Sequence, residues 1–214
     1  MEKYGTIPKR FTKAWWEYFW EYYKWHVIIT IVAGSMIAVT AYQLLSKIDY
    51  DITVTYIGSA KYDEDSEMKI SETLEKVTDD VNQNGNINVK FQNLTVRNID
   101  SGVESAQYTM ATEMKKTLEL QSGESEIFIL DKEQVLSVYE MNIANGLFLR
   151  SDDWATGEHE AAPGEASVYF LKIDNSFFEE RGFYTDDIYI GVKATDLTDK
   201  QGAAEKTADY ILNY

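Results

Sequence analysis

Residues 15–46 hold the clearest pattern of apolar positions in the chain. Eight of the eleven residues from Trp15 to Trp25 are aromatic, and the twenty residues from Val27 to Ser46 carry no charge. Trp and Tyr favour the headgroup level of a bilayer, and twenty helical residues at about 1.5 Å each cover a hydrocarbon core of about 30 Å. The pattern predicts one transmembrane helix, residues 26–47, after a cytoplasmic or interfacial aromatic segment, residues 1–25.

The aromatic segment has two interpretations. If it is helical, its rings form one apolar stripe, while Glu17, Glu21 and Lys24 lie on another face. Such a helix can lie in the headgroup plane of the lipid bilayer. Alternatively, it docks against another membrane protein. The residues expected at the membrane interface are Trp15, Trp16, Tyr18, Trp20, Tyr22, Tyr23 and Trp25.

The charges on either side of the span predict its orientation. Residues 1–25 contain five Lys or Arg and three Glu, whereas the span is followed by Lys47, Asp49 and Asp51. The excess of positive charge predicts a single-pass protein of the cell membrane with a cytoplasmic N-terminus and an extracellular C-terminal domain, residues 48–214. A signal peptide cleaved at Ala41 is the alternative, although the preceding region is longer and more aromatic than such peptides require.

From residue 50 onwards, strand-like and helix-like periodicities alternate. Such alternation favours an α/β three-layer sandwich, with helices on both faces of a mostly parallel five-stranded sheet. Four consecutive apolar residues, Ile127–Leu130, suit a central strand that is buried on both faces and flanked by the strands with Val54 and Val192. Right-handed crossovers then predict the strand order 2-1-3-5-4. The expected strands are near residues 52–58, 87–96, 127–130, 168–173 and 187–192, and the expected helices near 70–81, 108–122, 135–145 and 204–212.

Charge and composition narrow the function. The chain has 20 Lys and Arg and 36 Asp and Glu. Six of the basic residues and three of the acidic residues lie in residues 1–47. Residues 48–214 therefore have 14 basic and 33 acidic residues, a formal charge of −19. That charge disfavours nucleic acid as a partner. The chain has no cysteine, and it contains no phosphate-binding loop, nucleophile elbow, zinc-protease helix or dinucleotide fingerprint. These features predict a non-catalytic protein without a cofactor.

One region resembles a known family. Ser125–Asp131, the helix with Tyr139-Glu140-Met141, and the following Gly146–Leu149 and Asp152-Asp153 are similar to the first lobe of extracellular solute-binding proteins of ABC importers. Ile188–Lys193 looks like the returning strand of that family. The resemblance implies that one late strand is antiparallel. The chain has one lobe where that family has two, and 156–165 lies where the second lobe would be inserted. The whole chain also looks like a group of membrane-anchored proteins of clostridia-like bacteria. That resemblance implies a membrane topology but no activity, because none is assigned to the group.

These observations lead to two functional hypotheses. The first is a membrane-anchored extracytoplasmic binding module, transport-associated or sensing, whose partner would be an ABC-type transporter and whose ligand is an unknown small molecule. The second is a structural or accessory subunit of a membrane protein complex, docked through its aromatic transmembrane helix. Ligands of open α/β sheets bind beyond the carboxyl ends of parallel strands. We therefore expect a ligand site near Gly58, Ser59, Ala60, Asp131 and Lys132.

A weak metal motif lies between a helix and a strand. Asp80, Asn82, Asn84 and Asn86 are spaced like the first ligands of a calcium loop, with Gly85 at its sixth position. The twelfth position is Phe91, where a calcium loop needs a bidentate carboxylate. Because Asn-Gly is also a common turn dipeptide, an ordinary turn between helix and strand is the favoured interpretation, and weak calcium binding is the alternative.

Overall fold

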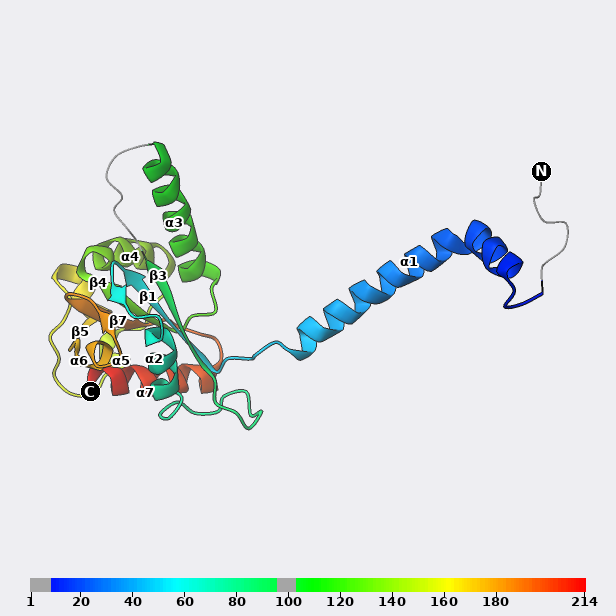
Figure 1. Ribbon diagram of the computed structural model, residues 1–214. Helices are drawn as coiled ribbons and strands as arrows, with labels where there is room; N and C mark the ends of the chain where they lie inside the picture. Colours follow the sequence, from blue (N-terminus) through cyan, green and yellow to red (C-terminus); the bar gives the residue numbers. More distant parts are fainter. Residues whose placement is uncertain (1–8, 96–102) are drawn as a thin grey trace. The chain divides into compact units, whose positions relative to one another are not determined.

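The chain consists of two compact units, Met1–Ile48 and Asp49–Tyr214 (Figure 1). The computed structural model describes residues 9–95 and 103–214. Part of the predicted cytoplasmic segment, residues 1–8, and Val96, at the end of the second predicted strand, lie outside the described residues.

The first unit contains one continuous helix, α1 (Lys13–Leu45). The hydroxyl of Thr12 caps its N-terminus by accepting the Trp15 N–H, at 3.3 Å. The aromatic and apolar segments therefore lie on one continuous helix of 33 residues, about 50 Å along its path at 1.5 Å per residue, which bends near its N-terminal end (Figure 1). The mean hydropathy of its most apolar stretch is 1.9, and none of that stretch is buried against the rest of the chain. α1 is long and apolar enough to cross a membrane.

The second unit is a mixed α/β domain. Within the described residues, five strands form one mostly parallel sheet and two short strands form a separate ribbon. The strands are β1 (Ile52–Gly58), β2 (Lys61–Tyr62), β3 (Val89–Thr95), β4 (Ile127–Asp131), β5 (Leu171–Ile173), β6 (Phe183–Tyr184) and β7 (Ile188–Val192). The helices are α2 (Ser66–Leu74), α3 (Val103–Ser122), α4 (Lys132–Asn145), α5 (Ser151–Trp154), α6 (Ser176–Glu179) and α7 (Thr198–Leu212), with a 3-10 turn at Gly164–Val168.

The order of the large sheet is β3-β1-β4-β7-β5. The predicted order 2-1-3-5-4 numbered only the five expected strands. The observed numbers differ because two short strands that were not predicted, β2 and β6, are counted as well. The five long segments themselves stand next to one another as predicted. β4 pairs in parallel with β1 and antiparallel with β7, and β7 is also antiparallel to β5. One late antiparallel strand in a mostly parallel sheet is therefore confirmed.

The sheet is covered on both faces by apolar clusters. Ile127 and Ile129 of β4 point into one cluster, with side chains of α2, α6 and α7, whereas Phe128 and Leu130 point into the other, with side chains of α3 and α4. Successive side chains of a strand point to opposite faces, so a central strand needs apolar residues at every position. All four residues are fully buried and β4 is third of the five strands, which confirms it as the central strand.

Several predicted elements differ in extent. α3 and α7 begin at Val103 and Thr198, before the predicted starts near 108 and 204. The helix predicted over 70–81 ends at Leu74, and Val77 and Val81 lie in turns that follow it. The chain has left the helical path by residue 81, where the buried carboxylate of Asp51 accepts the N–H groups of Val81 and Asn82. The strand predicted from residue 168 begins at Leu171, because the residues before it form the 3-10 turn.

Candidate functional site

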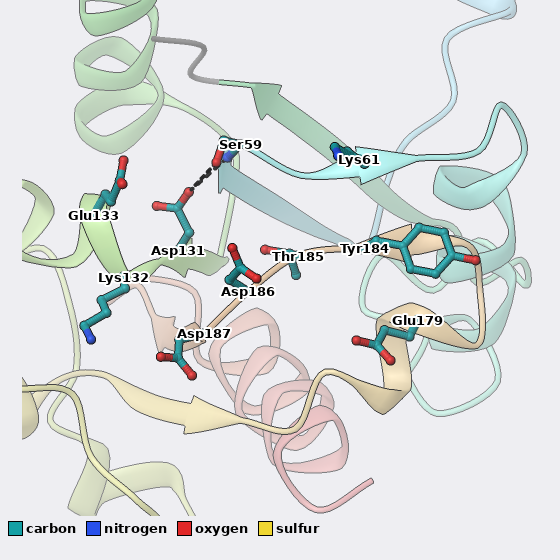
Figure 2. Close-up of a pocket in the computed structure, with 10 residues that line it drawn as sticks. All are labelled: Ser59, Lys61, Asp131, Lys132, Glu133, Glu179, Tyr184, Thr185, Asp186 and Asp187. Atoms are coloured by element: carbon teal, nitrogen blue, oxygen red, sulfur yellow. Dashed lines mark hydrogen bonds between the residues drawn. The ribbon is translucent and has the colours of Figure 1, made fainter.

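A cavity lies at the carboxyl ends of β1 and β4, the two neighbouring strands whose connections run to opposite sides of the sheet. After β1 the chain continues to β3 on one side of it, and then crosses to β4 on the other side. In open α/β sheets such a switch point leaves a crevice at the carboxyl ends of the two strands. A cavity of about 510 Å³ occupies this place (Figure 2). Its lining consists of Ser59, Lys61, Asp131, Lys132, Glu133, Glu179, Tyr184, Thr185, Asp186 and Asp187.

Three of the five residues expected at a ligand site line this cavity. They are Ser59, just after β1, and Asp131 and Lys132, at the junction of β4 and α4. Gly58 and Ala60 are buried beside it and do not belong to its lining. The prediction of ligand binding at these residues stays a prediction, and the structure brings three of them together around one opening.

Asp131 links the two strand ends. It is the last residue of β4 and the N-cap of α4, where its Oδ1 accepts the Gln134 N–H at 3.2 Å. Its Oδ2 accepts the Ser59 N–H at 2.9 Å, across from the end of β1 (Figure 2). Burial raises the pKa of the Asp131 carboxyl above its usual value, and these two N–H groups offset part of the rise. The carboxylate thus sits at the base of the cavity in a fixed orientation.

Gly58 makes this arrangement possible. A Cβ at this position would overlap the hydroxyl of Tyr56 and lie 2.5 Å from Oδ2 of Asp131. No side chain larger than hydrogen fits there unless one of these groups moves. Gly58 is therefore needed for the close approach of Tyr56 and Asp131 beneath the cavity.

Tyr56 supports the opposite wall from below. Its ring is fully buried and packs edge-on against Phe183, with ring centroids 4.9 Å apart. Its hydroxyl lies 3.1 Å from Oγ1 of Thr185, which lines the cavity. Burial raises the pKa of the Tyr56 phenol far above its ordinary value, so this group stays neutral over the physiological range.

The segment 184–187 forms the wall that sequence reasoning missed. Asn175 holds it, because its side-chain amide donates to the carbonyls of Thr185 and Asp186, at 2.9 and 3.0 Å. The ribbon of β2 and β6 brings Lys61 opposite Tyr184 at the edge of the same cavity (Figure 2). Two-residue strands leave no periodic signal in a sequence, so neither the ribbon nor this wall could be predicted.

The calcium-like loop lies apart from the cavity and has the hydrogen bonds of a turn. The carboxylate of Asp80 accepts the N–H groups of Asn84 and Gly85, at 3.2 and 2.9 Å. The side-chain oxygens of Asn82 and Asn84 accept N–H groups two residues later in the chain, the second from Asn86. These contacts agree with the favoured interpretation of an ordinary turn. Calcium binding stays a prediction.

Asp51 anchors this loop to the domain. The side chain is buried, and its Oδ2 accepts the Asn88 N–H at 2.9 Å in addition to the two N–H groups bound by Oδ1. One carboxylate therefore fixes both ends of the loop. The sequence gives no sign of this role, because an aspartate before a strand is usually solvated.

The residues predicted at the membrane interface all lie on α1. Rings stack at four-residue spacing along one side of this helix: Trp15 on Phe19 at 5.4 Å and Phe19 on Tyr23 at 5.5 Å between centroids. A shallow apolar groove continues from Phe19 to Ile31 on the same helix. The predicted interface residues are Trp15, Trp16, Tyr18, Trp20, Tyr22, Tyr23 and Trp25, and none of them is buried.

Comparisons of the chain with protein-family models, with curated proteins and with solved structures found no match. The resemblance to solute-binding proteins thus stays a hypothesis that rests on the sequence pattern.

Proposed function

We propose that this protein is a membrane-anchored, extracytoplasmic binding module whose α/β domain holds a small solute at the ends of β1 and β4. The observation that carries the proposal is the cavity of about 510 Å³ at the switch point of the sheet. Its volume falls within the usual range of ligand sites, about 300–1,000 Å³. Its polar lining comes from chain segments far apart in sequence, as expected of a binding site.

The chemistry of the lining supports binding rather than catalysis. It contains no histidine, which is the side chain that most often acts as a general base near neutral pH. The hydroxyl of Ser59 donates weakly to Asp131, at 3.4 Å, and the hydroxyl of Thr185 is engaged by Tyr56. We therefore propose a non-catalytic role, associated with transport or sensing.

A ligand screen on the full-length protein in detergent micelles tests this proposal. Sugars, amino acids, peptides, amines and metal salts are added singly, and thermal unfolding is followed. A true ligand at one hundred times its Kd stabilises the folded state by about 2.7 kcal/mol and raises the Tm. Equilibrium dialysis of each hit then gives its Kd.

The variant Gly58→Ala tests whether a ligand found in the screen binds in the cavity. Its Cβ pushes Tyr56 and Asp131 apart, so we expect the Kd of a hit to rise at least tenfold. Gly202→Ala is the matched control, because a Cβ there meets open space on α7 and should leave the Kd unchanged. A ligand whose Kd is the same in both variants binds elsewhere, and a broad panel without any hit would contradict the proposal.

The orientation of the chain is tested with protease. Added outside intact spheroplasts, it should remove residues 48–214 and leave an N-terminal tag protected, because the positive flank of the span favours the cytoplasm. Opening the cells with detergent is the control and should expose the tag. If the C-terminal domain is protected in intact spheroplasts, the proposed extracytoplasmic location is wrong.

A second proposal, an accessory subunit of a membrane complex, is favoured by α1. Its stacked aromatic rings and apolar groove lie on a helix without buried residues. Purification in mild detergent should then recover a partner, and replacing Trp15, Trp20 and Trp25 with Ala should release it. Tyr42→Ala, an exposed aromatic near the other end of α1, is the control and should retain the partner. Recovery of the protein alone would count against this role.

A further inference from the structure

The charges around the cavity are strongly unbalanced. The lining has five carboxylates and two lysines, a formal charge of −3. The cavity opens from a domain whose formal charge is −19. Such a field raises the local concentration of cations and repels anions. On charge alone, the cavity selects a solute with a positive group.

Much of this negative charge is not neutralised within the protein. Asp187 pairs with Lys172, at 3.0 Å. Within residues 9–95 and 103–214, Glu133, Glu179 and Asp186 make no ion pair, and Lys61 and Lys132 form none with them. Three carboxylates of the lining are therefore available to a ligand.

Asp131 provides an independent reason for a cation. Its side chain lies on the cavity, yet the residue is only 8% exposed. No lysine or arginine of the described chain neutralises it; its partners are N–H groups and the hydroxyl of Ser59. A buried carboxylate without a counter-ion is costly. A carboxylate accepts about four hydrogen bonds, so capacity remains for a donor in the cavity.

This inference rests on the proposed function: we infer that the solute of this cavity carries an ammonium group, which Asp131 and Asp186, two carboxylates of the same lining, receive. An ammonium has three donors and no acceptor, which suits a lining rich in carboxylate and hydroxyl oxygens. Within the described residues, no group of three or more His, Cys, Asp or Glu is placed to hold a metal ion. The inference therefore specifies an organic amine.

A matched series of five-carbon probes tests the inference on the full-length protein. The probes are 1,5-diaminopentane, 5-aminopentanoate, glutarate and pentane-1,5-diol, which differ only in their end groups. We expect both ammonium compounds to bind, with Kd values at least tenfold lower than those of glutarate and the diol. Equal or tighter binding of glutarate or the diol, or no binding of either ammonium compound, would overturn the inference.

Substitutions of single carboxylates test which side chains bind the ammonium group. Asp186→Asn and Asp131→Asn should each raise the Kd of 1,5-diaminopentane at least fivefold, and Asn preserves the helix cap at residue 131. Glu72→Gln, on α2 outside the cavity, removes the same charge and should leave that Kd unchanged. Thermal unfolding without ligand verifies that each variant is folded. Equal losses in all three variants would show a general charge effect and overturn the assignment to this cavity.

The two proposals fail in different ways. If the broad screen finds a sugar or an anion whose binding depends on Gly58, the binding module stands and the ammonium inference is wrong. If neither the screen nor the five-carbon series gives a ligand that depends on Gly58, both are wrong.

Discussion

Ile129→Ala is expected to lower the free energy of unfolding by about 2–5 kcal/mol, the usual cost of a large-to-small change in a packed core. Ile129 is fully buried in the middle of β4, where it packs in the cluster shared with α2, α6 and α7. The truncation removes apolar contacts and leaves a cavity that the neighbouring strands cannot close, because β1 and β7 hold β4 on both sides.

Urea unfolding followed by circular dichroism measures this loss. Ile143→Ala is the matched control, since this isoleucine is 65% exposed on α4 and its truncation should change stability by less than about 0.5 kcal/mol. A loss below about 1 kcal/mol for Ile129→Ala would show that the core is centred elsewhere.

Lys200→Met should destabilise the fold strongly, because it removes one member of a buried ion pair. Lys200 forms an ion pair of 2.7 Å with Glu126, whose side chain is 7% exposed. Removal of one partner leaves the other charge buried, and we expect a loss of about 3 kcal/mol at neutral pH. Lys206→Met is the control, because its pair with Asp79 is more than half exposed on both sides and should contribute less than about 1 kcal/mol.

The pH dependence distinguishes this loss from a packing defect. Burial raises the pKa of Glu126 above its usual value, while Lys200 and the Thr53 N–H lower it. Without Lys200 the pKa rises further, so the folded variant holds more protons than the unfolded chain and gains stability as the pH falls. The difference from the native protein should therefore be largest near neutral pH and shrink towards acid. A difference that is independent of pH would contradict the buried-charge explanation.

The parts of the fold that the sequence predicted are those with dense local signals. The uninterrupted apolar run at Ile127–Leu130 identified the central strand, because only burial on both faces tolerates such a run. Asn145-Gly146 located the end of α4, where Gly146 takes the left-handed conformation with φ of 62°. The strand-end rule then brought Ser59, Asp131 and Lys132 to one cavity.

The parts of the structure that could not be predicted from the sequence depend on contacts between residues far apart in the chain. α3 shows the problem. Met114 and Leu118 are apolar residues four positions apart in the helix predicted near 108–122, a spacing typical of a buried face, and yet they are 68% and 64% exposed. The helix instead buries Leu120 and Lys116, whose ammonium reaches Gln134 and Ser137 of α4 at 3.1 Å. A buried lysine is the opposite of what periodicity predicts. Likewise, the cavity wall at 184–187 depends on Asn175, ten residues away along the chain.

The point at which the first unit joins the α/β domain has a mechanical consequence. β1 begins at Ile52, four residues after the first unit ends at Ile48, and it is an inner strand. It is paired in parallel with β3 along its whole length and with β4 over Val54–Ile57. Tension applied through the first unit would therefore enter the sheet at the first residue of β1. A pull along this strand loads two ladders of hydrogen bonds in shear at the same time, whereas the same pull along an edge strand would load only one. Because forced unfolding is governed by the unfolding rate, this attachment should slow rupture of the domain under load.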